Sequence, residues 1–332
     1  MAKIKAKGTP KAIKRKHLSL PEFFERFGTE EQCICYFEKQ KWPNGFICPV
    51  CGEVEYLYLK NSQRYECRRC GHQTTIKAGT VMENSKLPLR TWLLMMYLIA
   101  CSVNGISALE LSRQAKIGYT AAKLNSRKLK YAMSERNGLY KLEGIVEIDE
   151  IKVGAPTPGH IGAASEKQDI EIMVQMHNNS LFPKYVKFCL LSSLNGESIK
   201  ETILAYVKSD SKLLADGAKA YKVLKTNYIV EQEVNNYKKD PDQHLWVNTL
   251  TSNLKSFILG TYHGVAKKYL FLAIAEFEWR YNRRTFGREM INSMTRAVIG
   301  VKGITHKKLI RLINDTEQAL AQQRLESLIH AL

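Results

Sequence analysis

Apolar and polar residues alternate with a period of two in several short stretches of the second half of the chain. Side chains of a strand point to its two faces in turn, so this alternation predicts strands. The predicted strands cover residues 144–153, 170–176, 185–191, 212–215 and 229–234. Helical spacing predicts helices at residues 198–208 and 218–224. The order, three strands and then alternating helix and strand, predicts a mixed α/β sheet with helices on its faces.

The first half of the chain has mainly helical periodicity. An apolar helix is predicted over residues 88–102 after Pro88, and a second helix over residues 107–117. Ser107 and Glu110 have the spacing of a capping box at the start of that helix. Gly118 marks a turn, and Thr120 is predicted to cap a third helix that runs through Lys130. This pattern resembles a helix-turn-helix.

The helix that follows the turn is basic. A basic helix in this place can enter the major groove of DNA, whereas an ordinary helical hairpin with a solvated basic face fits the same pattern equally well. Its predicted basic surface consists of Lys123, Arg127, Lys128 and Lys130.

Two Cys-x2-Cys pairs lie between the N-terminus and these helices, separated by fifteen residues. Four thiolates in two such turns are the ligand set of a structural Zn²⁺ ion, which predicts a zinc ribbon around Cys48, Cys51, Cys67 and Cys70. Gly52 and Gly71 follow the two pairs, where a tight turn favours positive φ. Unrelated thiol pairs or a redox pair are less favoured, since no βαβ pattern accompanies them. The other cysteines are predicted to be small packed side chains; they are Cys33, Cys35, Cys101 and Cys189.

Composition narrows the class of partner. The chain of 332 residues has 50 Lys and Arg against 32 Asp and Glu, a formal charge of +18. Such a balance favours nucleic acid as the partner, although ribosomal and membrane-surface proteins are equally basic. The length predicts two or three domains. The apolar run at residues 91–101 is too short to span a bilayer, and residues 1–17 hold seven Lys or Arg and no secretory signal. The reduced cysteines that zinc requires predict a cytoplasmic location.

Two aspartates stand at the ends of predicted strands. Asp149 closes the first strand, and Asp216 closes a short central strand 67 residues later. The element order is that of an RNase H-like nuclease core, in which converging carboxylates hold Mg²⁺ against a phosphate. Aspartates are also common turn formers, so the spacing alone does not separate the two roles. We expect Glu147 and Glu150, which flank Asp149, to point to the opposite face of the strand.

Several blocks of sequence, taken together, resemble those of bacterial insertion-sequence transposases with an N-terminal zinc ribbon, a helix-turn-helix and a DDE-like integrase core. Besides the two cysteine pairs, they are GTVMENSKLPLRTW (79–92), VEIDEIKVG (146–154), LLADGAKAY (213–221), HLWVNTLTSNLKSFILGTYHGV (244–265) and EFEWRYNRR (276–284).

The resemblance implies cleavage and joining of double-stranded DNA at terminal inverted repeats and a target. It implies two catalytic Mg²⁺ or Mn²⁺ ions, with Asp149 and Asp216 as the first two ligands. It also implies a homodimer or larger assembly, because two DNA ends must be brought together, and a place in the bacterial cytoplasm near the nucleoid.

The third metal ligand departs from the usual pattern. A DDE enzyme carries an acidic residue seven positions before a lysine on one helical face, whereas here Asn248 precedes Lys255. An amide oxygen can bind Mg²⁺ without adding negative charge, so weaker binding of the second ion is expected. Asn253 is a rival that lies off this face, and His244 and His263 flank the helix. Lys255 is predicted to contact a DNA phosphate or a terminal base.

A further helix is predicted over residues 276–284, followed by an amphipathic tail over residues 305–332. Three arginines of the first helix are predicted to contact DNA phosphates, namely Arg280, Arg283 and Arg284. The predicted domains are a basic arm (1–30), the zinc ribbon (31–78), the helical DNA-binding region (79–138), the catalytic core (139–287) and the helical tail (288–332).

Two other functions fit the same motifs. One is a DNA-binding regulator without enzymatic activity, which keeps the zinc ribbon and the helix-turn-helix beside a decayed core. The other is a related nuclease that acts on RNA or on DNA junctions. The arrangement of Asp149, Asp216 and Asn248 separates the regulator from the enzymes.

Overall fold

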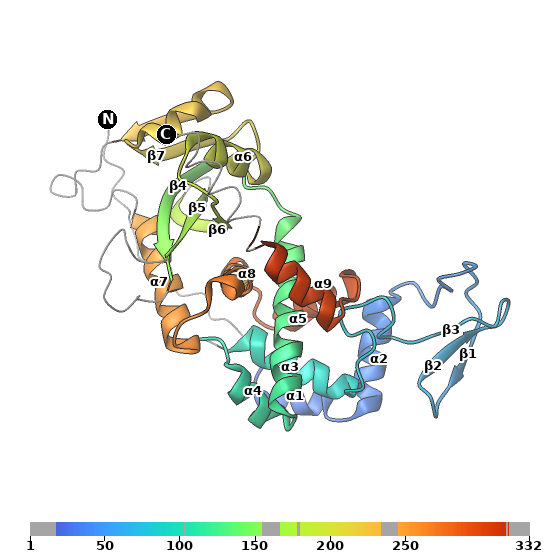
Figure 1. Ribbon diagram of the computed structural model, residues 1–332. Coiled ribbons are helices and arrows are strands. Elements are labelled where there is room, and N and C mark those ends of the chain that lie inside the picture. Colours follow the sequence, from blue (N-terminus) through green and yellow to red (C-terminus); the bar gives the residue numbers. More distant parts are fainter. Residues whose placement is uncertain are drawn as a thin grey trace. The chain divides into compact units, whose positions relative to one another are not determined.

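The computed structural model describes residues 18–102, 104–154, 167–177, 180–233, 245–316 and 318. Residues 1–17 of the predicted basic arm, His244 and the end of the predicted tail lie outside these residues, whereas residues 18–30 of that arm are described and include a helix. The described chain divides into two compact units (Figure 1). The N-terminal unit contains residues 18–136 and 286–309, and the sheet unit contains residues 137–285 with 310–316.

The N-terminal unit begins with two short helices that were not predicted, α1 (Leu20–Phe27) and α2 (Glu30–Lys41). Each starts with a complete capping box. Ser19 pairs with Glu22 and Thr29 with Gln32, so that side chains satisfy the first free main-chain N–H groups. The local sequence therefore carried the information for both helices.

Helix α2 packs against α3 (Leu89–Cys101) and α9 (Glu289–Gly300) in one helical bundle. The apolar face of α3 is fully buried there, including Trp92. The Tyr36 hydroxyl is 2.8 Å from Asn292 Oδ1 and 3.0 Å from Thr295 Oγ1, which ties α2 to α9. Residues far apart in the sequence thus share one core in this unit.

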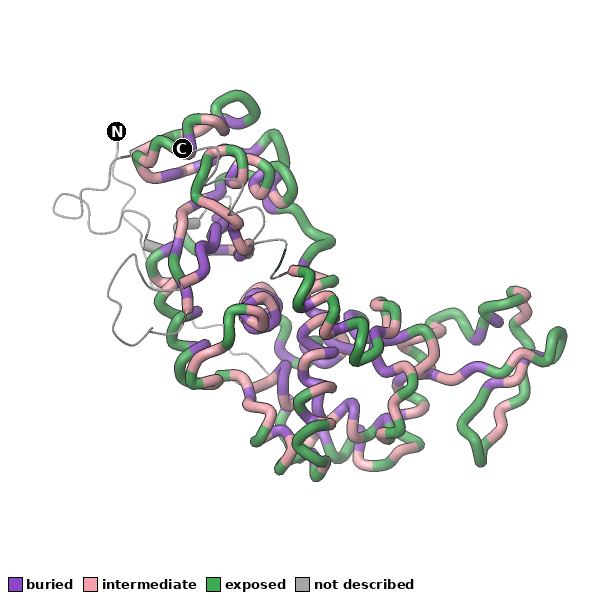
Figure 2. The backbone as a smooth tube through the Cα atoms, in the orientation of Figure 1, coloured by how far each residue is buried: buried purple, intermediate pink, exposed green. Residues whose placement is uncertain are grey.

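The zinc ribbon extends from α2 as a three-stranded antiparallel sheet with β1 (Tyr56–Leu59), β2 (Arg64–Cys67) and β3 (Gln73–Thr74). The predicted hairpin is confirmed by the pairing of β1 with β2. Tyr65 is its one fully buried aromatic ring and packs between Trp42 and Tyr58. Most other ribbon residues are exposed or half-buried (Figure 2). The ribbon therefore has very little apolar core of its own.

Two lysines hold the segment from residue 75 to residue 88 in place. Lys41 Nζ donates to three main-chain carbonyls between residues 75 and 78, at 2.7 to 2.9 Å. Lys77 Nζ donates to the carbonyls of Ser85 and Leu87 at 3.0 and 2.7 Å. Burial lowers the pKa of Lys41 to about 8, and the charge of Glu83 opposes that shift. Much of the block at residues 79–92 thus has a structural role.

The predicted helix-turn-helix consists of α4 (Ala108–Ala115) and α5 (Tyr119–Gly138). Ser107 Oγ accepts from the Glu110 N–H at 3.1 Å, which confirms the Ser107 half of the predicted capping box. Gly118 lies in the turn between the two helices as predicted, and Lys116 in the same turn is left-handed (φ 51°). Thr120 lies inside α5, so its predicted role as the cap is wrong. Lys116 follows the last residue of α4, where a helix commonly ends in this conformation.

The sheet unit contains a mixed five-stranded sheet with the order β6-β5-β4-β7-β8. Strands β4, β5 and β6 are antiparallel, whereas β7 and β8 run parallel to β4. This confirms the predicted α/β class and all five predicted strands. Their bounds are β4 (Ile145–Val153), β5 (Gln168–His177), β6 (Ser180–Leu190), β7 (Lys212–Asp216) and β8 (Ile229–Glu233).

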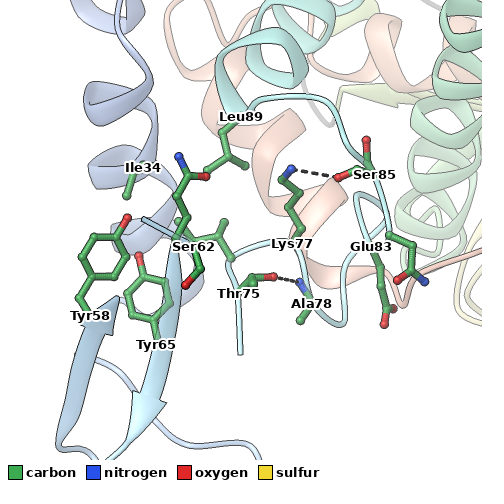
Figure 3. Close-up of a pocket in the computed structure, with 13 residues that line it drawn as sticks. Ile34, Tyr58, Ser62, Tyr65, Thr75, Lys77, Ala78, Glu83, Ser85 and Leu89 are labelled. Atoms are coloured by element: carbon green, nitrogen blue, oxygen red, sulfur yellow. Dashed lines mark hydrogen bonds between the residues drawn. The ribbon is translucent and has the colours of Figure 1, made fainter. Parts of the chain in front are cut away.

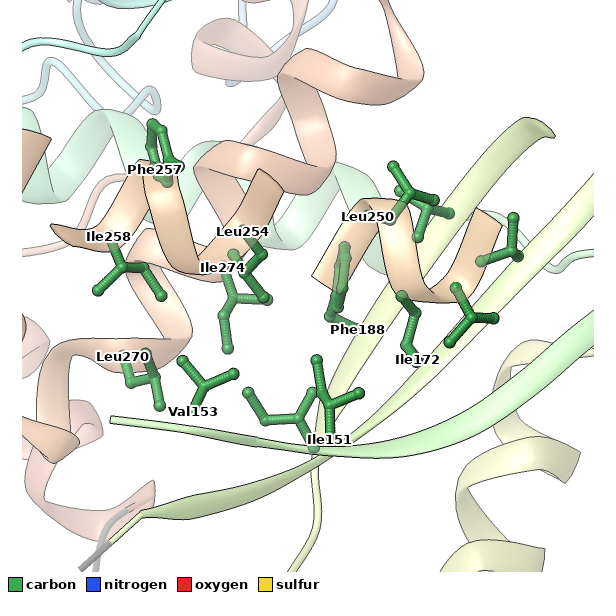
Figure 4. Packing of buried hydrophobic residues seen from close by; sticks show 14 of the residues in the cluster. Ile151, Val153, Ile172, Phe188, Leu250, Leu254, Phe257, Ile258, Leu270 and Ile274 are labelled. Atoms are coloured by element: carbon green, nitrogen blue, oxygen red, sulfur yellow. The ribbon is translucent and has the colours of Figure 1, made fainter. Parts of the chain in front are cut away.

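Helices cover both faces of this sheet. Even-numbered β4 residues such as Ile148 pack with α6 (Gly196–Tyr206) and η2 (Lys219–Thr226). Odd-numbered residues such as Ile151 pack with α7 and α8 (Figure 4). Segment η2 is a 3-10 helix, whereas its spacing had been read as α-helical. The other helical elements of this unit are α7 (Leu245–Tyr262), η3 (Lys267–Tyr269) and α8 (Leu270–Asn282).

A buried ion pair joins α8 to β6. Glu278 Oε1 lies 3.8 Å from Lys187 Nζ, and both side chains are almost completely buried. Burial raises the pKa of Glu278 from 4.5 to about 7, although Lys187 and the Phe188 N–H both favour the charged form. The folded unit therefore holds a proton at pH 5 to 7 that the unfolded chain has released.

We expect this carboxyl group to make the sheet unit less stable as the pH rises from 4.5 to above 7. A raised folded pKa contributes stability that is complete below the unfolded pKa and is lost above the folded one, here roughly 3 kcal/mol. Glu278→Gln removes this titration, so urea unfolding at pH 5 and pH 8 should give the variant a shallower pH slope. The two proteins should be close in stability at pH 5, where folded Glu278 carries its proton, and should differ at pH 8, where only the wild type has a buried carboxylate at this position. Equal slopes in the two proteins would contradict the assignment.

Candidate functional site

The pairing of β4 with β7 brings Asp149 and Asp216 side by side. These parallel strands are in register from Ile145 with Lys212 to Ile148 with Ala215. The two aspartates are the next residues on their strands, and adjacent strands lie about 4.8 Å apart. The offset of 67 residues therefore puts both aspartates at neighbouring positions of adjacent strands. Asp216 ends β7 as predicted, whereas Asp149 lies in the middle of β4, which corrects the expectation that it closes the strand.

Main-chain N–H groups orient both carboxylates. The Glu150 N–H donates to Asp149 Oδ1 at 2.8 Å, and the Ala218 N–H donates to Asp216 Oδ1 at 3.0 Å. Behind Asp216, Gln232 Nε2 donates to the carbonyls of Asp216 and Ala218 and fixes the turn that follows β7. Both side chains are half-buried. Two oriented, partly desolvated carboxylates on adjacent strands are suited to bind a divalent cation.

Further acidic groups lie on the opposite face of the sheet, the face that α7 does not cover. Glu150 on β4 stands directly opposite Glu171 on β5, and Glu171 is fully buried with the Tyr221 hydroxyl 3.3 Å from its Oε1. Burial raises the pKa of Glu150 to about 7, with added repulsion from Asp216 and Asp149. Burial also raises the pKa of Glu171 well above its usual range, and the Glu150 charge adds to this. Part of the rise at Glu150 thus comes from the negative charge of the two aspartates, which a bound cation would relieve.

The expectation that Glu147 and Glu150 both point away from the Asp149 face was wrong for Glu147. Residues two apart on a strand share a face, so Glu147 and Asp149 both lie on the α7 side of β4. Its carboxylate accepts a hydrogen bond from the Val247 N–H in the first turn of α7. Burial nevertheless raises the pKa of Glu147 to about 7. Only Glu150 points to the opposite face.

Helix α7 carries the predicted third ligand. Asn248 and Lys255 are both exposed, and their separation of seven residues, two helical turns, puts them on one face. Val247, Leu250 and Leu254 of the same helix are buried against the sheet. Asn253 is also exposed but lies well off the face of Lys255.

His263 follows the last turn of α7 with a left-handed φ of 52°, and its N–H donates to the Leu259 carbonyl. This residue therefore terminates the helix. His244, the other histidine beside α7, lies outside the described residues.

The four predicted zinc ligands come together in the N-terminal unit. Their sulfur atoms all lie within 4.8 Å of one another, and the closest pairs are 3.5 to 3.7 Å apart. A tetrahedron with Zn–S bonds of 2.3 Å has edges of about 3.8 Å, so this geometry fits zinc. Gly52 and Gly71 have φ values of 76° and 69°, and each donates its N–H to the first cysteine carbonyl of its pair. The predicted positive φ at both glycines is confirmed.

The remaining cysteines lie apart from this site. Cys33 and Cys189 are in packed surroundings, and Cys33 Sγ is 3.6 Å from the Phe27 carbonyl oxygen. Cys35 is exposed on α2, which corrects the expectation that it is packed.

Two family models match the chain. The zinc-ribbon domain model of transposases covers residues 28–73, and the ISXO2-like transposase domain model of the IS1595 group covers residues 141–282. Together they cover more than half of the chain and include both metal-binding candidates. The chain belongs to the IS1595 group of transposases. The predicted family is thereby confirmed.

An uncharacterised protein in the transposable element ISH50 of Halobacterium salinarum is a relative of this transposase. It is 29% identical over 136 residues, which are 40% of this chain and 45% of that protein. The match thus spans less than half of the length of either protein.

Solved structures of Mos1 transposase complexes have limited similarity to this chain. The Mos1 strand transfer complex matches 62% of this chain and 81% of that chain, with 12% identity and a TM-score of 0.23. The Mos1 paired-end complex with the left transposon end matches 64% of this chain and 81% of that chain, with 12% identity and a TM-score of 0.23. TM-scores this low carry no argument about the transposase.

The predicted phosphate-binding arginines of the transposase are engaged within the sheet unit. Arg283 is buried and donates to the Trp279 carbonyl and the Tyr140 hydroxyl, at 3.2 and 2.7 Å, so its guanidinium group is not on the exposed surface of this unit. Arg284 donates to the carbonyls of residues 183 and 184. Arg280 is mostly buried and stands 3.9 Å from the Glu276 carboxylate. Sequence spacing did not reveal that these guanidinium groups fasten α8 to its surroundings.

The basic surface of α5 is smaller than predicted. Lys128 is buried and donates to the Val81 carbonyl at 3.4 Å, and Lys130 is also buried, so neither fits the predicted exposed face. Lys123 is exposed and Arg127 is half-buried. These two residues are what remains of the predicted DNA-binding surface on this helix.

A cavity of about 290 Å³ lies between the zinc ribbon and the segment that the two lysines hold (Figure 3). Its wall includes Tyr58, Tyr65 and Lys77. The lysine points toward the Ser85 carbonyl, so its charge is already compensated within the N-terminal unit. The cavity therefore lacks a free cationic group from this lysine and is not assigned to a ligand.

Proposed function

We propose that this transposase cleaves DNA at the ends of its mobile element and joins them to a target. The observation that carries the proposal is the register of β4 on β7, which aligns Asp149 with Asp216 on adjacent strands. Asp149, Asp216 and Asn248 would hold Mg²⁺ or Mn²⁺, and their oxygen atoms are the donors that such ions prefer. The repulsion between both aspartates and Glu150 supports this, because a bound cation would relieve it.

The chemistry requires two successive attacks on phosphorus. In the first, water attacks the terminal phosphodiester and the 3′ oxygen leaves; in the second, that 3′ hydroxyl attacks target DNA and displaces another 3′ oxygen. The bound ions would polarise the phosphate and activate the attacking oxygen. Asp149 and Asp216 hold their carboxylates at a fixed separation, and Asn248 adds a neutral oxygen. Lys255, exposed on the same helical face as Asn248, would hold a DNA phosphate.

Double-stranded DNA is the proposed partner. The net charge of +18 favours binding to a polyanion, and Lys123 and Arg127 on α5 are the candidate contacts in the N-terminal unit. Bringing two ends together requires at least a dimer. None of the helices in the described ranges is long and apolar enough to cross a membrane. We propose that the protein works in the cytoplasm, where its DNA substrate lies.

The test is strand cleavage of a duplex that carries the element's terminal repeat, with Mg²⁺ or Mn²⁺ supplied. We expect cleavage at the repeat boundary, none with a shuffled sequence, and none after chelation of the catalytic ions. Binding to the repeat without cleavage under all metal conditions would favour a DNA-binding regulator. The neutral Asn248 in place of an acid is the observation that keeps this second function in view. Equal cleavage of repeat and generic duplex, or of RNA, would favour a nuclease.

We expect Asn248→Ala to raise the Mg²⁺ concentration needed for half-maximal cleavage by roughly 10-fold, because one oxygen ligand is lost. Asn248→Asp should lower that concentration, because a carboxylate adds the missing charge. Metal titrations of the cleavage rate measure both effects. Asn253→Ala is the matched control, since Asn253 lies on the same helix, is exposed and points elsewhere. A larger effect at position 253 than at position 248 would reverse the assignment.

A further inference from the structure

Glu147 connects the strand that carries Asp149 to the helix that carries Asn248. Its carboxylate accepts a hydrogen bond from the N–H of Val247, which lies in the first turn of α7. The first four N–H groups of a helix have no partner within the helix. Glu147 on β4 therefore provides the hydrogen-bond acceptor for a first-turn N–H group that an N-cap side chain usually provides.

The position of this hydrogen bond relates it to the proposed metal site. Glu147 and Asp149 lie two residues apart on the same face of β4, and Val247 directly precedes Asn248. The side-chain oxygen Oε2 of Glu147 is buried and has no hydrogen-bond partner among the residues that the structure describes. The positive end of the helix partly offsets the cost of burying this carboxylate.

Packing against one core cluster holds α7 along its length, from Val247 in the first turn onward, whereas Asn248 is exposed. Leu250, Leu254 and Phe257 fasten the middle of the helix to the sheet (Figure 4). Asn248 precedes these contacts and is exposed. In the first turn, Val247 is buried against the sheet and its N–H is held by Glu147. Loss of this hydrogen bond would let the first turn fray while the remainder stays docked.

We propose that Glu147 is a positioning residue that holds the first turn of α7, and with it Asn248, at a fixed place beside Asp149. The inference rests on the proposed role of Asn248 as a metal ligand. A metal ligand needs a defined position, and residues that orient such ligands typically affect metal affinity by 10- to 100-fold. Glu147 acts here through Asn248 and not by direct contact with the ion.

Amide hydrogen exchange tests the local part of this proposal without DNA or catalytic metal. In Glu147→Ala we expect faster exchange in residues 245–250, at least several-fold, with unchanged exchange in residues 254–262. Glu147→Gln keeps an oxygen that can accept from the Val247 N–H and should restore most of the protection. Glu143→Ala is the matched control, because Glu143 is exposed beside the same strand and is ion-paired with Lys208. Unchanged exchange in Glu147→Ala would overturn the proposal.

A double-mutant cycle tests the functional part. Glu147→Ala should raise the Mg²⁺ concentration for half-maximal cleavage by about 10-fold in the wild-type background. In the Asn248→Ala background the same change should have less than a twofold effect, whereas in Asn253→Ala it should keep its full effect. Additivity with Asn248→Ala would overturn the proposal. So would a loss in Glu147→Gln as large as in Glu147→Ala, because the carboxylate would then act directly on the ion.

Failure of this inference is distinct from failure of the proposed function. If the wild-type protein does not cleave end DNA, the function is wrong and the cycle has no rate to report. The exchange experiment then still decides whether Glu147 holds the first turn of α7. If the wild-type protein cleaves but the cycle is additive, the function stands and the positioning role does not.

Discussion

Alanine at Asp149 or Asp216 is expected to lower the rate of strand cleavage at element ends by roughly a thousand-fold or more. Metal ions stabilise the charge that develops in phosphoryl transfer by several kcal/mol, and about 1.4 kcal/mol corresponds to a factor of ten in rate. Each aspartate contributes one of the two carboxylates that the register of β4 on β7 aligns. Binding of the terminal repeat should remain, because neither carboxylate attracts DNA. Cleavage rates and gel-shift affinities measure the two quantities separately.

The aspartate variants need a control for folding. Asp149 and Asp216 both raise the pKa of the buried Glu150, so removing one charge should relieve repulsion and leave the sheet unit at least as stable. Asn variants keep an oxygen for the main-chain N–H groups of Glu150 and Ala218 and remove only the charge. Asp210→Ala, at an exposed position before β7, should cleave normally. Retained cleavage in both alanine variants would exclude this pair as the metal ligands.

Local periodicity was sufficient to predict the sheet and the pair of aspartates. Residues 170–176 alternate with the strand period of two, which is easy to recognise, and the other strands are short apolar or β-rich runs. The two aspartates follow apolar runs of equal character, so their alignment follows once the two strands are adjacent and parallel. That these two strands are neighbours in the sheet was inferred from the order of helices and strands along the chain, because neither strand alone indicates its partner.

The roles of charged side chains were harder to predict, since they depend on tertiary contacts. Arg283 and Lys128 both look like surface cations in a helical projection, yet each is buried and donates to main-chain carbonyls. The residues next to a lysine or arginine do not indicate which distant carbonyl it will bind. The partner of Lys128, the Val81 carbonyl, lies 47 residues away in the sequence. The misplacement of Glu147 had a different origin. Strand alternation, applied correctly, puts it on the Asp149 face.

The second large effect concerns the zinc ribbon. Removal of zinc by chelation, or the change Cys67→Ser, is expected to unfold residues 46–74. The ribbon buries one aromatic ring fully and leaves most other side chains in contact with water, so its apolar core is too small to offset the entropy of ordering. Structural zinc contributes roughly 10 kcal/mol or more to the folding of such units. Zinc content and amide exchange in the ribbon measure the loss.

The effect should stop within the N-terminal unit. Amide exchange in β4 and β5 should stay slow without zinc, because the sheet unit has its own core on both faces of the sheet. Exchange in α2 should rise moderately, since Glu38 and Tyr65 link that helix to the ribbon. Cys35→Ser is the matched control, because Cys35 is an exposed cysteine on α2 outside the ligand set and its loss should leave the zinc content unchanged. A ribbon that keeps slow exchange after complete removal of zinc would show that its aromatic cluster suffices for folding, against the balance of burial and chain entropy.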